Sequence, residues 1–434
     1  MVSADAMRRF FKSNESKMTF LTREQSALIR GSVPILRQHG ETIAKLFYAD
    51  MLEAHPEMND IFNSVNQKNG RQPSALTSVM LAFAANISDT SEVIPRLERV
   101  CNKHCSLGVT PDQYDIVGRF LLQAFAKVLG GEWTPKLHEA WAKAYSILSR
   151  MLIGRESQLY KEFGAWKGWR PLRITQKIAE TEDIFSFYLQ SADGSPLPRF
   201  TPGQYISIRV KVPSIGYLQS RQYSLSDCPG MGHYRISIKR DRGVQIGGGL
   251  EAFQLKPGLV SNLLLDSYGV GDTIDASHPA GAFIFDNEVH STVPIVLISA
   301  GSGVTPLMSI LNTVMDRQPS RAVSWIQCSA SSAPFEDYVR SLAAQRRNLT
   351  THFWKSRVAD VDYRTGTARA EGMRLDLERL SHEELHLGHG STEYYICGPE
   401  AFIQDMSNTL EARGVGQTRI RYEWFSTGDS KFRH

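Results

Sequence analysis

Hydrophobic residues recur at helical spacing through the first third of the chain, from Thr22 to about Phe163. One face of such a helix carries Ile116, Phe120, Ala124 and Val128, with Val117, Leu121 and Phe125 beside it. The sequence 110–113, Thr-Pro-Asp-Gln, supplies an N-cap, a first helical proline and a capping-box glutamine. We therefore predict an all-α region in which one helix ends near Cys105 and the next begins at Pro111.

The period of the apolar positions changes to two beyond a Gly-, Trp- and Lys-rich stretch at 164–170. The alternating positions are Leu172/Ile174, Ile206/Ile208/Val210/Val212 and Ile236/Ile238. Alternation of this kind indicates half-buried antiparallel strands, and turn clusters at 192–196 and 227–230 separate them. The pattern predicts a small antiparallel β-barrel that runs to about Phe285.

A third pattern, in which short apolar runs alternate with helical stretches, begins after about Ser291. The runs and stretches pair as 293–298 with 305–314, 323–328 with 335–342, and 394–397 with 400–410. Such alternation is typical of βαβ units and a parallel sheet. The predicted fold class is thus multi-domain: an all-α domain, then an antiparallel β-barrel domain, then an α/β domain with a parallel sheet. The expected divisions are an N-terminal extension over 1–18 and domains over 19–163, 168–286 and 291–434.

Composition excludes several classes of protein. The 434 residues are long enough for about three domains. A formal net charge of only +4, without a basic run that alternates with aromatic residues, argues against binding of nucleic acid. The longest apolar stretch, 293–300, is much shorter than the ~18 residues that a membrane span needs. Five cysteines without a C-x-x-C pair argue against a disulfide framework and favour a reducing compartment.

Residues 1–18 carry four basic and two acidic side chains together with serines, a composition that weakly resembles a mitochondrial presequence. The alternative is a disordered cytosolic tail, or a functional start at Met18. No apolar core of the kind found in secretory signals is present in this segment. We expect a cytoplasmic protein, with the mitochondrial matrix as the alternative.

Two loops of the third region are candidates for nucleotide binding. The sequence 299–306, Ser-Ala-Gly-Ser-Gly-Val-Thr-Pro, follows a predicted strand, and its glycines would let backbone amides approach a pyrophosphate. We predict a helix that begins at Pro306 with Thr305 as its N-cap. Cys397-Gly398-Pro399 also lies between a strand and a helix, which places both loops at the carboxyl edge of one parallel sheet, where ligands bind.

The barrel region contains two further candidate motifs. Residues 221–224, Arg-Gln-Tyr-Ser, supply a cation, an aromatic face and a hydroxyl, and residues 258–261, Gly-Leu-Val-Ser, supply a turn and a second hydroxyl. Together they can bind a stacked ring and a diphosphate. In order along the chain, the motifs R-x-Y-S, G-x-x-S, G-x-G-x-T-P and C-G-P, with an aromatic residue near the end, resemble the ferredoxin-NADP reductase family over about 168–434.

This resemblance implies FAD held by Arg221, Tyr223 and Ser224, with Tyr205 and the Phe425 region near the isoalloxazine ring. The further cofactor-binding residues that we expect here are Gln222, Gly258, Ser261, Gly301, Gly303, Thr305, Pro306, Cys397, Gly398, Pro399 and Glu423. The choice between NADH and NADPH stays open, because the serines at 329, 331 and 332 after the second sheet strand suit either ribose.

His104, near the end of the helix that precedes Thr110, is the candidate ligand of the all-α region. A histidine at this position is suited to be an axial ligand of haem iron. Cys101, His104 and Cys105 lie at i, i+3 and i+4 and offer zinc as an alternative, but a fourth ligand is missing.

Further motifs of the same region resemble the globin family in its flavohaemoglobin branch over about residues 20–163. They are Phe47-Tyr48, Ile61-Phe62-Asn63, Asn69-Gly70-Arg71-Gln72, Lys103-His104 with Tyr114, and Arg155-Glu156. The resemblance implies that His104 is the proximal haem ligand and that Tyr48 and Gln72 face the sixth iron position. It also implies that Phe62 packs on the porphyrin, Leu76 narrows the pocket, Lys103 helps to bind a cofactor, and Tyr114 and Glu156 hold the free nitrogen of the proximal histidine.

A globin followed by a reductase in this order resembles the flavohaemoglobin family, whose members are nitric oxide dioxygenases. The resemblance implies haem b, FAD and NAD(P)H as cofactors, nitric oxide and oxygen as small-molecule substrates, and a monomeric enzyme. Two local departures are Ser426-Thr427 after Phe425, where the family commonly has Gly-Pro, and the glycine-rich stretch 245–254. Two alternatives are an oxygen-binding or sensing globin with its own haem reductase, and a reductase for a separate partner protein.

Overall fold

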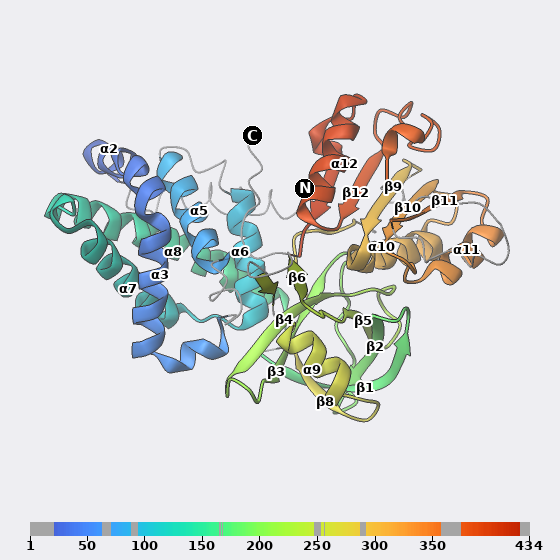
Figure 1. Cartoon of the computed structure of the whole chain (residues 1–434), viewed down its shortest axis with the longest axis horizontal. Coiled ribbons are helices and arrows are strands. Elements are labelled where there is room, and N and C mark those ends of the chain that lie inside the picture. Colours follow the sequence, from blue (N-terminus) through green and yellow to red (C-terminus); the bar gives the residue numbers. More distant parts are fainter. Residues whose placement is uncertain are drawn as a thin grey trace.

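The computed structural model describes residues 21–62, 71–87, 94–164, 166, 168–246, 253–255, 257–286, 292–356 and 375–425. Figure 1 shows three lobes: a helical lobe in blue to teal, a β-sheet lobe in green to yellow, and an α/β lobe in orange to red. The predicted extension over 1–18, the pair Asn69-Gly70 and Ser426-Thr427 lie outside the described residues. The order of the three lobes confirms the predicted fold class.

The first lobe is helical throughout its described residues. Its helices are α2 (Arg23–Gly31), α3 (Val33–Ala54), α5 (Arg71–Ala85), α6 (Ile94–Leu107), α7 (Pro111–Leu129) and α8 (Pro135–Glu162), with 3₁₀ turns at Pro56–Asp60 and Gly130–Glu132. Helix α3 packs against α5 and α7, and α6 packs against α8. The predicted start of α7 is confirmed. The backbone N–H of its N-cap Thr110 donates to the Gln113 side-chain oxygen at 3.0 Å.

The second lobe is a six-stranded antiparallel sheet in the order β4-β3-β8-β1-β2-β5. Its elements are β1 (Arg170–Ala179), β2 (Ile184–Ser191), β3 (Tyr205–Lys211), β4 (Leu218–Ser224), β5 (Tyr234–Lys239), α9 (Leu259–Ser267) and β8 (Thr273–Ala276), with a separate hairpin of β6 (Val244–Ile246) and β7 (Phe253–Leu255). A bridge between Leu225 and Ile236 joins the two outer strands, so the sheet closes into a barrel. The predicted apolar positions of the strands fill its core.

The third lobe is a five-stranded parallel sheet in the order β11-β10-β9-β12-β13. Its elements are β9 (Ile295–Ala300), α10 (Val304–Arg317), β10 (Val323–Ser329), α11 (Glu336–Gln345), β11 (Leu349–Lys355), β12 (Glu393–Cys397), α12 (Glu400–Ala412) and β13 (Ile420–Glu423), with 3₁₀ turns at Gly301–Gly303, Leu377–Arg379 and Gln417–Arg419. Helices α10 and α11 cover one face of the sheet and α12 covers the other, which buries both faces.

The predicted start of the helix after β9 is wrong by two residues. Helix α10 begins at Val304 with Gly303 as its N-cap, and Thr305 lies inside the first turn. The Thr305 hydroxyl donates to the Ser302 carbonyl at 3.0 Å instead of capping the helix. Pro306 is tolerated at the third helical position because the first N–H groups of a helix have no partner within the helix.

Candidate functional site

The proximal side of the all-α lobe is built around His104 on α6. Its Nδ1 lies 2.9 Å from Glu156 Oε1 and 2.8 Å from the Tyr114 hydroxyl, and that hydroxyl donates to the same carboxylate oxygen at 2.5 Å. The Glu156 side chain is 5% exposed, whereas that of His104 is 31% exposed. Since both of these contacts are made by Nδ1, Nε2 is left for a ligand. Burial, reinforced by the neighbouring carboxylate, raises the pKa of Tyr114 and keeps its proton in place.

The zinc alternative has no support in the geometry. The Cys101 and Cys105 thiols donate to the α8 carbonyls of Leu152 and Glu156, at 3.9 and 3.7 Å. Burial raises the pKa of both thiols, which disfavours the thiolates that zinc needs. Within the described ranges no three His, Cys, Asp or Glu side chains are arranged to hold a metal ion. His104 with one open nitrogen fits an axial haem ligand better.

A buried ion pair that the sequence analysis missed fixes α6 on α8. Arg155 binds Glu98 through two N–H groups, each 2.9 Å from a carboxylate oxygen, and the two side chains are 5% and 2% exposed. Arg155 precedes Glu156 in the chain, so the pair holds the backbone that carries the partner of His104. The signal in the sequence was a glutamate at a position of α6 that is otherwise part of its apolar face.

The distal side lies between α3 and α5. Tyr48 is buried, and its ring meets that of Phe62 edge-on at a centroid distance of 5.5 Å. Burial raises the pKa of Tyr48, a shift that a hydrogen bond with the Gln72 side chain opposes. The Gln72 Oε1 atom is buried without a hydrogen-bond partner. Leu76 belongs to the same apolar cluster, so Tyr48 and Gln72 are two polar residues among apolar side chains, a composition that suits a haem pocket.

The flavin-binding candidates of β4 come together at the edge of the barrel. Arg221 donates to the Ser220 carbonyl at 2.8 Å, and no carboxylate among the described residues pairs with it. Burial lowers the pKa of Arg221 and raises that of the adjacent Tyr223. A half-buried guanidinium without a carboxylate partner fits an anionic group such as a diphosphate.

Two glycines shape the rest of this site. Gly258 is the N-cap of α9, and a Cβ at that position would lie 2.7 Å from the Ser261 hydroxyl. Gly281 has a φ of +128°, and a Cβ there would lie 3.1 Å from the ring of Tyr205. Both positions need glycine, the first to leave room beside a helix N-terminus and the second to let the backbone approach Tyr205.

The predicted residues Lys103 and Glu423 lie close enough to interact electrostatically, and Arg221 of the barrel acts on the same lysine. All three lobes therefore contribute a charged residue to this region. Arg99 lies 3.6 Å from Glu423 and donates to the Trp424 carbonyl at 3.2 Å. Burial lowers the pKa of Lys103 to about 8, and Arg99 and Arg221 contribute to this shift. Burial raises the pKa of Glu423, against the effect of Arg99 and Lys103. Phe425 follows this cluster and is 52% exposed.

Gln222 is linked to the helical lobe through Ser207. Its side chain donates to the Ser207 hydroxyl at 3.0 Å, and Ser207 in turn donates to Ser106 of α6 at 2.9 Å. The barrel therefore contacts the helix of His104 directly.

The nucleotide loops lie together at the carboxyl edge of the parallel sheet, as predicted. A Cβ on Gly303 would collide with the Cys397 carbonyl and the Gly398 nitrogen, so the two loops touch only because residue 303 is glycine. The hydroxyls of Ser299 and Ser329, at the ends of β9 and β10, are buried without a hydrogen-bond partner. Pro399 is the N-cap of α12, so the first N–H groups of α10 and α12 begin at this edge and suit a pyrophosphate.

Comparison with protein families divides the chain in the same way. The globin family model matches residues 45–152, the oxidoreductase FAD-binding domain matches 171–285, and the oxidoreductase NAD-binding domain matches 297–408. No helix in the described part of the chain is long and apolar enough to cross a membrane.

Relatives match nearly the whole chain. The flavohemoprotein of Bordetella parapertussis is 39% identical over 94% of this chain and 99% of its own length, and that of Bacillus subtilis is 39% identical over 92% and 96%. The crystal structure of the flavohemoglobin from Malassezia yamatoensis, with bound FAD and heme, superposes with a TM-score of 0.77 at 28% identity and covers 94% of this chain and all of that one. The cofactors of this chain are accordingly haem, FAD and a nicotinamide nucleotide, and the chain belongs to the flavohemoprotein family.

Proposed function

We propose that the protein is an NAD(P)H-dependent nitric oxide dioxygenase that converts nitric oxide and oxygen to nitrate. The observation that carries this proposal is the arrangement around His104, whose Nδ1 meets both a buried carboxylate and a phenol. When bound, the nucleotide would supply hydride to FAD, and FAD would pass single electrons to the haem at which oxygen and nitric oxide react.

The residues of the proximal side prepare His104 for this role. The Glu156 carboxylate accepts a hydrogen bond from the Nδ1–H of His104, which fixes the tautomer and would leave Nε2 for the iron. A carboxylate acceptor makes imidazole a stronger electron donor than a backbone carbonyl does, which suits redox work rather than oxygen storage. On the distal side, the Tyr48 hydroxyl keeps its proton and can donate it in a hydrogen bond to a diatomic substrate.

The reductase lobes bind and orient the electron carriers. Arg221 and the N-terminus of α9 would hold the diphosphate of FAD, and Tyr205 and Tyr223 would pack beside its ring. The glycine loop before α10 and the loop before α12 would hold the pyrophosphate of the nucleotide. All three sites lie in one chain, which supports a self-sufficient enzyme that acts on small molecules, and we propose that it is a monomer. The five cysteines are free thiols, which favours a reducing compartment, cytosol or mitochondrial matrix.

The test is to follow nitric oxide with an electrode and nitrate by ion chromatography while NADH or NADPH is supplied. A dioxygenase consumes nitric oxide catalytically and forms one nitrate for each nitric oxide, and consumption stops when either oxygen or the nucleotide is withheld. A storage or sensing globin would bind oxygen without turnover. A reductase for a separate partner would keep its activity toward an added electron acceptor after His104→Ala, whereas nitric oxide consumption by the proposed enzyme would cease.

A further inference from the structure

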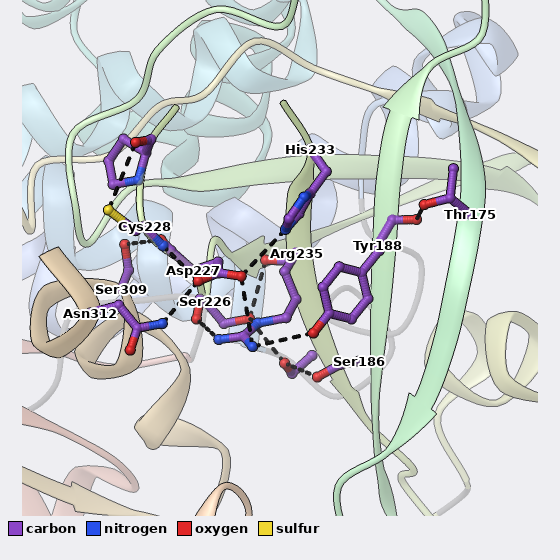
Figure 2. A network of polar contacts seen from close by, with 12 residues as sticks. Thr175, Ser186, Tyr188, Ser226, Asp227, Cys228, His233, Arg235, Ser309 and Asn312 are labelled. Atoms are coloured by element: carbon purple, nitrogen blue, oxygen red, sulfur yellow. Dashed lines mark hydrogen bonds and ion pairs between the residues drawn. The ribbon is translucent and has the colours of Figure 1, made fainter. Parts of the chain in front are cut away.

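A second polar cluster, half-buried at Asp227, lies at the turn that follows β4. Figure 2 shows Asp227 at its centre, between strands of the barrel and helix α10 of the nucleotide lobe. Asp227 Oδ1 accepts hydrogen bonds from the Cys228 backbone at 2.8 Å and from the Asn312 amide at 2.9 Å. The Ser309 hydroxyl donates to the Asp227 carbonyl at 2.7 Å. One residue of the barrel thus receives two hydrogen bonds from one helix of the other lobe.

The barrel holds the other carboxylate oxygen of Asp227. His233 Nε2 lies 3.3 Å and Arg235 Nη1 3.8 Å from Oδ2. Arg235 is itself fixed, because its guanidinium donates to the Ser226 carbonyl and hydroxyl and lies 5.0 Å above the ring of Phe335, which belongs to the nucleotide lobe. The charge of Asp227 is therefore balanced from the barrel, while its Oδ1 and its backbone carbonyl accept hydrogen bonds from α10.

The position of this cluster in the chain links the two cofactor sites. Asp227 comes three residues after Ser224, at the end of the strand that carries Arg221 and Tyr223. Ser309 and Asn312 lie on the helix that starts directly after the glycine loop 301–303. A shift of α10 relative to β4 would move the nucleotide loop relative to the flavin strand by a similar amount. Hydride transfer is sensitive to such a shift, since a misplacement of about 1 Å lowers the rate of a reaction roughly a hundredfold.

We propose that Asp227 is a positioning residue for hydride transfer, which fixes helix α10 on the flavin barrel and so sets the distance between nicotinamide and flavin. Asp227 acts through Asn312 and Ser309 rather than by contact with either cofactor. The inference rests on the proposed reduction of FAD by NAD(P)H. It adds a residue outside the motifs that bind the cofactors.

The test uses the full-length holoenzyme in an anaerobic stopped-flow instrument, with NADH or NADPH at a series of concentrations and flavin absorbance as the signal. The variants are Asn312→Ala and Ser309→Ala on α10 and Asp227→Ala on the barrel. The control is Asn348→Ala, because the Asn348 amide donates to the Arg321 carbonyl within the nucleotide lobe. We expect the limiting rate of flavin reduction to fall about tenfold or more in Asn312→Ala and Asp227→Ala, with the nucleotide Kd unchanged. The control should keep the wild-type limiting rate.

Hydrogen exchange of the same proteins without nucleotide gives a readout that does not depend on activity. Asn312→Ala should speed exchange in the turn 227–232 and in the first half of α10, and leave β9 and β10 unchanged. The effects of Asp227→Ala and Asn312→Ala on the limiting rate should be far from additive, because each change alone removes the hydrogen bond between these two side chains.

Three results would overturn the proposal: an unchanged limiting rate in both Asn312→Ala and Asp227→Ala, a rise in Kd without a change in rate, or exchange that increases throughout the nucleotide lobe. If Asp227→Ala fails to fold, the two α10 variants still decide the question. Failure of the underlying function would look different, because wild-type flavin would then not be reduced by either nucleotide.

Discussion

The two sides of the haem pocket are built on opposite principles. On the proximal side the buried polar groups are paired: His104 Nδ1 and Tyr114 share the Glu156 carboxylate, and Arg155 is paired with Glu98. On the distal side Tyr48 lies among apolar side chains, and Gln72 Oε1 has no partner. A fully paired network holds one geometry, whereas unpaired polar groups in an apolar pocket are available to a ligand that comes and goes. In the proposed enzyme, the proximal side would therefore hold His104 in one orientation, and the distal side would leave Gln72 Oε1 and the Tyr48 proton for a bound substrate.

The largest effect that this comparison predicts comes from His104→Ala. The variant should retain little or no haem, because the network around Glu156 then lacks the imidazole that binds iron. FAD should stay bound, since the barrel closes independently through the Leu225–Ile236 bridge. Haem and flavin content after gel filtration, read from the Soret band and from released FAD, measure both effects. His138→Ala, an exposed histidine on α8, is the control and should keep its haem. Normal haem content in His104→Ala would contradict the proximal assignment.

The next largest effect should come from Arg155→Leu. This change leaves the Glu98 carboxylate buried without its cation, which lowers the free energy of unfolding by about 3–5 kcal/mol. Urea unfolding of the full chain, followed by the helical circular dichroism signal, measures the loss. Arg150→Leu is the control on the same helix, because Arg150 is exposed and donates only to the Ser146 hydroxyl; it should change stability by less than about 0.5 kcal/mol. Replacing Glu98 and Arg155 together by leucine should restore most of the stability, and equal losses in the single and double variants would contradict the paired-charge explanation.

A substitution on the distal side should change the binding of the diatomic ligand rather than the stability of the fold. Tyr48→Phe removes one hydrogen bond to a partly anionic diatomic ligand, worth on the order of 1.5–3 kcal/mol. We expect oxygen to dissociate roughly ten- to a hundredfold faster, with haem and FAD content unchanged. Stopped-flow oxygen dissociation from the reduced proteins measures this, with Tyr145→Phe as the control, because the Tyr145 hydroxyl donates to the Tyr114 carbonyl. Equal dissociation rates in Tyr48→Phe and wild type would show that Tyr48 does not hydrogen-bond the ligand.

Local signals predicted the elements of this fold, and long-range contacts explain what they missed. The spacing of apolar residues and the cap at Thr110 act within a few residues, so the start of α7 was predictable. The start of α10 was misplaced because a Thr-Pro pair indicates an N-cap, whereas Gly303 at the contact with the Cys397 loop sets the actual start.

The site shows the same division. The position of His104 and its partners followed from a family resemblance, because no local pattern joins residues 52 positions apart. The Glu98–Arg155 pair and the contacts of Asp227 with α10 span 57 to 85 positions and escaped prediction altogether.

The smallest effect expected of the distal side belongs to Gln72. Gln72→Leu removes the hydrogen bond to Tyr48, worth about 0.5–1.5 kcal/mol, but it also removes a buried carbonyl oxygen without a partner, which carries a desolvation penalty of about 1–3 kcal/mol. The second term is at least as large as the first, so the free energy of unfolding of the haem-free protein should stay the same or rise by about 1 kcal/mol. Oxygen dissociation from the loaded protein should accelerate by no more than about tenfold, since Tyr48 keeps its own hydroxyl. Urea unfolding and stopped-flow dissociation measure the two quantities. A loss of stability above about 1 kcal/mol would show that Gln72 Oε1 has a partner in solution, and the distal side would then be a paired network like the proximal one.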